Sequence, residues 1–176
     1  MKSNSNGALS SISLSRNDVP APDKLKALFA TNRGLLQKTL QKLAKFNQRQ
    51  LDDIVHKLHH EAFEMYDCLD CSNCCRSISP AISHNDVEAM AKKLKVRPSD
   101  LVGKHLKLDE EGDFVFHTAP CPFIDDGNYC NIYSHRPKAC REYPHTDRSR
   151  FYQILKLSLK NAEVCPVVYA ILMKLA

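Results

Sequence analysis

The spacing of apolar residues predicts a helical region before the first cysteine. Leu25, Leu28 and Phe29 are three and four residues apart, as on one face of a helix. Similar spacing continues further along, and Gly34 is expected to separate a short helix from a longer one. We therefore predict a helical extension, residues 22–66, that packs on the core. A partner-binding or membrane-lying helix is less favoured, because charges of both signs cover the polar face.

Shorter elements are expected further along the chain. Ser83, with Asp86 in the first turn, has the pattern of a helix N-cap, and this helix should end near Lys95. Pro98 opens another short helix. Within residues 106–117, Leu-Lys-Leu and Phe-Val-Phe flank an acidic turn, which predicts a β-hairpin.

The C-terminal region combines short helices with one ambiguous segment. Pro137 is suited to the start of a short helix, and Pro166 to the start of a final one. Residues 151–159 are rich in apolar side chains and fit either a strand or a helix. The elements together predict an α+β fold that is mostly helical. We expect a small metal-stapled cysteine domain with a short β-hairpin and an N-terminal helical extension.

Composition divides the chain into three regions. Residues 1–21 are dominated by Ser, Asn and Gly and predict a disordered leader. The helical extension follows, and residues 67–176 hold all eight cysteines and are predicted to form a cysteine-cluster metal-binding domain. Hydrophobic residues make up 43% of the chain, but Trp is absent, which favours a modest core that metal would staple.

Four cysteines fall within the eight residues Cys68-Leu69-Asp70-Cys71-Ser72-Asn73-Cys74-Cys75. Two residues between cysteines let a tight turn bring both sulfurs onto one metal ion. Neighbouring side chains diverge in most backbone conformations. The sulfurs of Cys74 and Cys75 are therefore expected to serve different metals or opposite sides of one cluster.

The other four cysteines are spread over the remainder of the chain. Eight thiolates fill two four-sulfur sites with none left over, and an iron–sulfur cluster is also held by thiolates. The predicted cofactor is therefore zinc or iron, in two four-sulfur sites or an iron–sulfur cluster. The predicted metal ligands are Cys68, Cys71, Cys74, Cys75, Cys121, Cys130, Cys140 and Cys165.

The expected compartment decides between metal sites and disulfides. The N-terminus lacks the apolar run and cleavage site of a secretory signal, and no stretch approaches 18 uninterrupted apolar residues. We expect a cytoplasmic protein without a membrane span, in which reduced thiols bind metal. A secreted disulfide scaffold is the less favoured alternative.

The net charge gives no argument for a nucleic-acid partner. Its value of +5 falls to +1 once eight thiolates contribute −8 and two Zn²⁺ ions contribute +4. The basic run from Lys92 to Arg97 is typical of a solvated helix end, and it lacks the interleaved aromatics of a single-strand binder. An unknown protein or small molecule is the expected partner.

Three histidines near the end of the helical extension are a weaker candidate site. His56 and His60 share a helix face and have the spacing of a metal-binding pair. Glu64 stands where the metalloprotease motif that starts at His60 would need a histidine. We favour a solvated helix end, because the cysteines already fill two sites.

The cysteine spacing and its flanking residues resemble the YkgJ-type cysteine-cluster (CxxCxxCC) family. The shared features are Cys-x2-Cys-x2-Cys-Cys, Cys121, the string from Cys130 through Ile132-Tyr133 and Arg136-Pro137 to Cys140-Arg141, and the late Cys165. The resemblance covers roughly residues 66–170 and implies a zinc- or iron-chelating domain, often described as an iron–sulfur protein.

Two limits apply to this resemblance. Flagellin lysine methylases contain a related cysteine region, but this chain shows no glycine-rich nucleotide loop, so methyl transfer is not implied. Ser72-Asn73 stands where many family members have Gly.

Arg136 and Arg141, which flank Cys140, are the predicted cofactor-binding residues. Their charges would offset a thiolate-rich cluster or hold an anionic substrate. In the alternative interpretation they brace the loop by bonding backbone carbonyls or a carboxylate, and the two roles are compatible. The sequence therefore predicts a metal-binding protein whose biological role is undefined. An iron–sulfur-dependent redox or modifying enzyme is the alternative.

Overall fold

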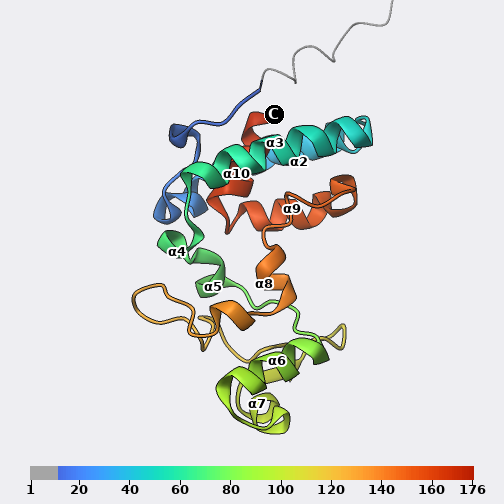
Figure 1. Ribbon diagram of the computed structural model, residues 1–176. Coiled ribbons are helices and arrows are strands. Elements are labelled where there is room, and N and C mark those ends of the chain that lie inside the picture. The colour runs from blue at the N-terminus through green and yellow to red at the C-terminus, as the bar shows by residue number, and fades with distance from the viewer. Residues whose placement is uncertain (1–11) are drawn as a thin grey trace, which may run out of the picture. The chain divides into compact units, whose positions relative to one another are not determined.

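The computed structural model describes residues 12–176, which form two compact units. The helical unit comprises the described residues up to Asp67 together with Pro144–Ala176, and the cysteine unit comprises Cys68–Tyr143. Helices predominate (Figure 1). A two-stranded antiparallel sheet is also present, so the predicted mostly helical α+β fold is confirmed. No helix among the described residues is long and apolar enough to cross a lipid bilayer.

The helical unit is built around its last helix. It contains α2 (Pro22–Leu43), α3 (Gln48–Met65), η3 (Phe151–Ile154), α9 (Leu155–Ala162) and α10 (Pro166–Lys174). In α10 every residue from Pro166 to Leu172 is buried, and this helix packs against α2, α3 and α9. A helix that is apolar on all sides belongs in the centre of a bundle. Pro166 stands at its first position, as predicted.

The break between the first two long helices differs from the prediction. Gly34 lies inside α2 and does not separate two helices. The helix ends at Leu43, and α3 begins after Asn47, whose side chain accepts a hydrogen bond from the backbone N–H of Gln50. An isolated glycine is tolerated inside a helix, whereas an Asn N-cap satisfies a backbone donor that the helix leaves open.

Part of the predicted disordered leader has defined contacts. Residues 1–11 lie outside the described residues. Leu14 is buried, its backbone N–H donates to Glu61 at 2.8 Å, and Asp18 pairs with Lys174 at 2.9 Å. The short helix η1 (Arg16–Asp18) lies between these contacts. The expectation of disorder therefore does not hold for this stretch, which packs within the helical unit.

The segment that re-enters the helical unit is hydrogen-bonded to α3. The His59 Nδ1 and Thr146 Oγ1 atoms lie 2.7 Å apart, and His56 Nε2 donates to the carbonyl of Arg148 at 2.9 Å. Asp52 accepts hydrogen bonds from the backbone N–H groups of Arg150 and Phe151. These contacts fix residues 144–151 along one helix.

The cysteine unit is a series of short elements around a small apolar core. Its elements are α4 (Cys68–Cys71), α5 (Asn73–Ser77), α6 (His84–Leu94), α7 (Pro98–His105), β1 (Leu106–Leu108), β2 (Phe114–Phe116), η2 (Tyr133–His135) and α8 (Lys138–Glu142). Its buried core residues are Ile82, Val87, Met90, Ala91, Leu101, Leu106, Phe116, Phe123 and Ile132.

Helix α6 begins and ends as predicted, and its N-terminus also holds another segment. The Ser83 side chain accepts from the N–H of Asp86, and Asp86 accepts from Ser83 in return, which completes a capping box. The second carboxylate oxygen of Asp86 accepts from the backbone N–H of Lys138 at 2.9 Å. A buried carboxylate thus joins the start of α6 to the start of α8, which carries Cys140.

The predicted hairpin is confirmed. Leu106 pairs with Phe116 and Leu108 with Phe114. In the turn, the Asp109 side chain accepts from the N–H groups of Glu111 and Asp113, and Gly112 adopts a positive φ of 85°. This positive φ favours glycine, so the residue types of the acidic turn match its geometry.

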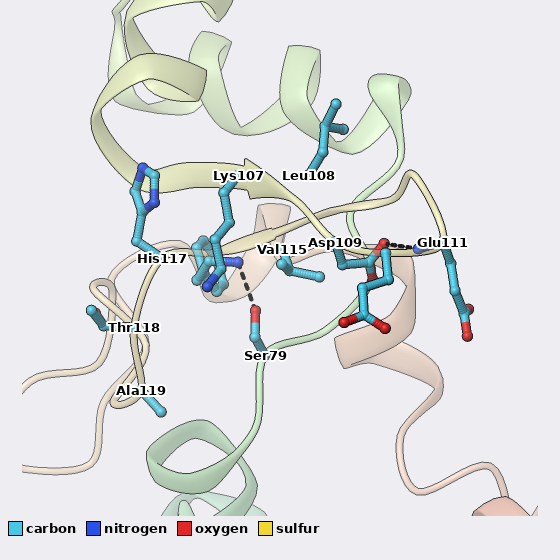
Figure 2. A pocket seen from close by; sticks show the side chains of 11 residues that line it. Ser79, Lys107, Leu108, Asp109, Glu111, Val115, His117, Thr118 and Ala119 are labelled. Carbon is cyan, nitrogen blue, oxygen red and sulfur yellow. Dashed lines mark hydrogen bonds between the residues drawn. The ribbon is translucent and has the colours of Figure 1, made fainter.

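A pocket of about 790 Å³ lies along this hairpin. Figure 2 shows Lys107 and His117 on its sides together with Asp109 and Glu111, and Ser79 bonded to the backbone of β2. None of the cysteines lines it. The pocket is therefore distinct from the cysteine cluster.

Candidate metal centre

The CxxCxxCC segment folds into two short helical turns, α4 and α5, joined at Ser72. Ser72 is buried and adopts φ 44° and ψ 13°, which is the left-handed region. Glycine enters this region without steric cost. The Ser72 backbone N–H also donates to the carbonyl of Cys68 at 2.8 Å, which closes the first turn.

A second segment, residues 121–131, lies against the first. The backbone N–H of Cys121 donates to the carbonyl of Cys75 at 2.8 Å. Ile124 and Cys130 form an isolated antiparallel bridge, so that the loop folds back on itself. Cys121 and Cys130 both pack against the apolar core of the unit. The loop therefore presents two cysteines close to the end of the CxxCxxCC segment.

Four thiols from separate parts of the sequence interact electrostatically: Cys75, Cys121, Cys130 and Cys140. Burial raises the pKa of Cys140 to about 12, and the Cys75, Cys121 and Cys130 thiols add to this effect. Burial likewise raises the pKa of Cys121 to about 11 and also raises that of Cys130. Each of these thiols therefore lies within the range over which the charge of at least one of the others shifts its pKa.

Cys75 is the member of this group that ionises first. Its Sγ lies 3.9 Å from the Sγ of Cys74, and the hydrogen bond between these thiols lowers the pKa of Cys75 to about 7. The positive charges of Arg136 and Arg76 act in the same direction, against the effect of burial. The group therefore already holds a partly ionised thiol at neutral pH.

The two predicted cofactor-binding arginines have different surroundings. The guanidinium of Arg136 lies 3.8 Å from the centre of the Tyr133 ring. Its charge contributes to the lowered pKa of Cys75 and partly opposes the rise in the pKa of Cys130 and Cys140 that burial causes. Its Nε is buried and has no hydrogen-bond partner among the described residues. Arg141 donates to the backbone carbonyl of Arg136. Arg136 is thus close to the sulfurs, and Arg141 braces the backbone beside it.

Residues 67–166 match a family model with the description "CxxCxxCC: Putative zinc- or iron-chelating domain". The chain belongs to the CxxCxxCC family. No curated protein and no solved structure matched the chain in the corresponding searches. The CxxCxxCC match starts one residue before Cys68 and ends one residue after Cys165, so it includes all eight cysteines.

The remaining predicted ligands have varied positions. Cys68 is exposed, and Cys71 and Cys74 are partly buried on α4 and α5. Cys165 is buried in the helical unit as the N-cap residue of α10. The role of all eight cysteines as ligands stays a prediction.

Two further observations concern ligand geometry. The eight cysteines, which all lie in the described part of the chain, form no disulfide. Among residues 12–176 no three His, Cys, Asp or Glu side chains are already arranged around a common metal position.

In the helical unit, His56 bonds the carbonyl of Arg148 and the His60 ring stacks edge-on against His59 at 5.4 Å.

Sequence reasoning missed three residues that join the cysteine segments. The Asn128 Oδ1 atom accepts from the Ser72 hydroxyl at 2.6 Å and from Arg76 Nη2 at 2.7 Å. The partners are about fifty residues apart along the chain, which no local pattern reveals. An available signal was Asn128 itself, because Asn after Gly in a polar turn tolerates the left-handed conformation that it adopts here.

Proposed function

We propose that this protein binds a zinc or iron ion through the thiolates of Cys75, Cys121, Cys130 and Cys140. The observations that carry the proposal are the electrostatic interaction of these four thiols, which belong to three separate segments of the cysteine unit, and the backbone hydrogen bond from Cys121 to Cys75. Thiolates are preferred ligands of zinc and of iron–sulfur clusters. Membership of a zinc- or iron-chelating family supports the same conclusion.

The charges around these thiols suit a bound cation with four thiolates. Four thiolates and one Zn²⁺ carry a net charge of −2, which is unfavourable in a partly buried site unless it is compensated. Arg136 and Arg76 are the cations that act on Cys75. We propose that they offset the charge of the loaded site, with Arg136 as the principal cofactor-facing residue and Arg141 as its brace.

Cys68, Cys71 and Cys74 are proposed as further ligands, either of a second ion or of a larger iron–sulfur cluster. The turn at Ser72 supports this proposal, because it places them on two consecutive short helical turns. A bound zinc ion would cross-link the cysteine-bearing loops and stabilise the fold of the unit. Bound as an iron–sulfur cluster, the metal would supply electron transfer, which is the enzymatic alternative.

Elemental analysis and absorption spectra of the full chain, purified anaerobically, test this function. We expect one or two zinc ions per chain, or iron in the amount that an iron–sulfur cluster contains. A colourless zinc-loaded protein supports a structural site, and a brown protein with visible absorbance supports a cluster. A fully reduced protein that binds neither metal would contradict the proposal.

Cysteine-to-serine variants locate the ligands. Cys121→Ser and Cys130→Ser should lose metal, because each removes one of the four coupled thiols. Cys165→Ser tests the eighth predicted ligand on its own. Retained metal in this variant would limit the ligand set to the cysteine unit.

A further inference from the structure

We infer that Asn128, Ser72 and Arg76 form a sulfur-free clamp that holds the two cysteine-bearing segments in register before metal binds. This inference rests on the proposed function for its consequence, which is tighter metal binding. The clamp joins the α4–α5 segment to the loop that carries Cys121 and Cys130. All its contacts lie within the cysteine unit.

Asn128 is the centre of the clamp. Its Oδ1 accepts three hydrogen bonds: from Ser72 Oγ at 2.6 Å, Arg76 Nη2 at 2.7 Å and Arg76 Nε at 3.1 Å. Its Nδ2 donates to the carbonyl of Asp70 at 3.4 Å. One carboxamide thus bonds three residues of the α4–α5 segment, and the guanidinium contributes two donors in the fixed fork of an arginine.

The backbone on both sides is shaped for these contacts. Ser72 and Asn128 both adopt left-handed conformations, with φ 44° and 67°. The Asp125 side chain accepts from the N–H of Tyr129 at 2.8 Å, which closes the turn around Asn128, and Arg76 Nη2 also donates to the carbonyl of Asp125 at 3.2 Å. Two turns, each with a residue in the left-handed region, are thus joined through the single side chain of Asn128.

The position of the clamp in the sequence links it to the metal ligands. Ser72 separates Cys71 from Cys74, Arg76 follows Cys75, and Asn128 precedes Cys130 by two residues. Every clamp residue therefore restrains the backbone of a proposed ligand. Groups that fix the orientation of ligands typically change metal affinity by about 10- to 100-fold when they are lost. Asn128 and Arg76 are accordingly positioning residues.

The decisive comparison is Asn128→Gly with Asn128→Asp in the full, reduced chain. Glycine keeps the left-handed backbone but removes all the side-chain bonds, whereas aspartate keeps the acceptor for Ser72 and Arg76. We expect Asn128→Gly to weaken zinc binding about 10- to 100-fold, measured by competition with a chromogenic chelator. Asn128→Asp should retain most of the wild-type affinity. Equal zinc affinity for wild type and Asn128→Gly would overturn the inference, as would equal losses in both variants.

Matched controls separate the clamp from general effects. Asp126→Gly adds the same backbone freedom to the same turn but removes an exposed side chain, and it should bind zinc as the wild type does. Arg76→Lys keeps the charge and loses the fork, so it should weaken binding, whereas Arg97→Lys on α7 should not. A loss in Asp126→Gly as large as that in Asn128→Gly would contradict the clamp.

Amide hydrogen exchange of the metal-free chain tests the clamp independently of metal. In the wild type the N–H of Cys121, which donates to the Cys75 carbonyl, should be protected, and Asn128→Gly should speed its exchange at least tenfold. Unchanged exchange would refute the clamp even if zinc binds. Clamp-dependent exchange in a chain that binds neither zinc nor iron would instead refute the proposed function and leave the clamp established.

Discussion

The helical unit and the cysteine unit are stabilised in different ways. In the helical unit, α10 is buried along seven successive residues and three other helices pack around it. In the cysteine unit, the longest helix is α6 and nine apolar side chains form the core. Much of that unit is loop, joined by the Asp86–Lys138 hydrogen bond and the Asn128 clamp. Burial of apolar surface is the main contact in the first unit, whereas in the second directional hydrogen bonds join the loops, and the proposed metal would add to them.

The largest expected effect is the loss of metal when a thiolate ligand is removed. Cys75→Ser and Cys140→Ser, as well as Cys71→Ser and Cys74→Ser, should lower metal content and destabilise the cysteine unit. Structural zinc sites in small domains contribute about 10–16 kcal/mol of binding free energy, so loss of the metal should remove most of the folding stability of that unit. Elemental analysis measures the metal content, and amide hydrogen exchange measured separately for the cysteine unit and the helical unit measures the stability. Unchanged metal and exchange in all four variants would contradict the assignment.

A steep pH dependence of metal affinity is the next effect. Near neutral pH the thiol of Cys75 is partly ionised, because its pKa is about 7. Those of Cys121 and Cys140, with pKa values of about 11 and 12, are protonated, as is that of Cys130, whose pKa is also raised. Metal binding must displace these protons, so affinity should rise with pH, by about a thousandfold per unit for three protons. Chelator competition at several pH values measures this slope. A flat profile between pH 6.5 and 8 would argue against these ligands.

A core substitution in the helical unit should have the converse effect: it should destabilise that unit and leave the metal content of the cysteine unit unchanged. Ile171 on α10 is fully buried, and Ile171→Ala should destabilise the helical unit by about 2–5 kcal/mol. Metal content should stay at the wild-type value, because the four coupled thiols lie in the cysteine unit. Denaturant unfolding and elemental analysis of the same preparation provide the test. Loss of metal in this variant would show that the units do not behave independently.

The smallest expected effect is a pH dependence of the helical unit that does not involve metal. Burial lowers the pKa of His59 below its usual 6.5; Asp147 opposes this, and His60 and His56 add to it. As the pH falls, His59 is protonated in the unfolded chain at a higher pH than in the folded chain. The stability that depends on neutral His59 is therefore fully present above about pH 6.5 and is lost as the pH falls through the pKa of His59 in the folded state. His59→Gln should flatten the acid limb of the unfolding profile. An identical acid limb in variant and wild type would exclude His59 as the cause.

Sequence patterns predicted the elements whose signals are local. Ser83 with Asp86 identified the start of α6, the acidic turn identified the hairpin, and Pro166 identified the start of α10. Each depends on residues within a few positions, where capping and turn chemistry act. The helix break was misplaced at Gly34 because burial of the α2 face, which a sequence does not reveal, outweighs the low helix propensity of one glycine.

Contacts between distant residues were beyond local reasoning. The cysteine spacing and the family resemblance identified the cluster, but they did not separate Cys75, Cys121, Cys130 and Cys140 as an interacting group. That grouping depends on how the loops fold. The helical extension was expected to pack on a core formed by residues 67–176, but the grouping of residues 144–176 with it in one unit was not predicted, nor was the role of Asn128. These features arise from pairs of residues whose partners are chosen by the tertiary structure.

The chain order of the two units has a consequence for biosynthesis. The cysteine unit lies between α3 and the segment that ends in α10, so the helical unit is assembled from both sides of an insertion. Helices α2 and α3 leave the ribosome long before α10, the helix against which they pack. Their apolar faces lack this contact until α10 has been synthesised. The inserted unit can begin to fold before α9 and α10, which complete the helical unit, have been synthesised.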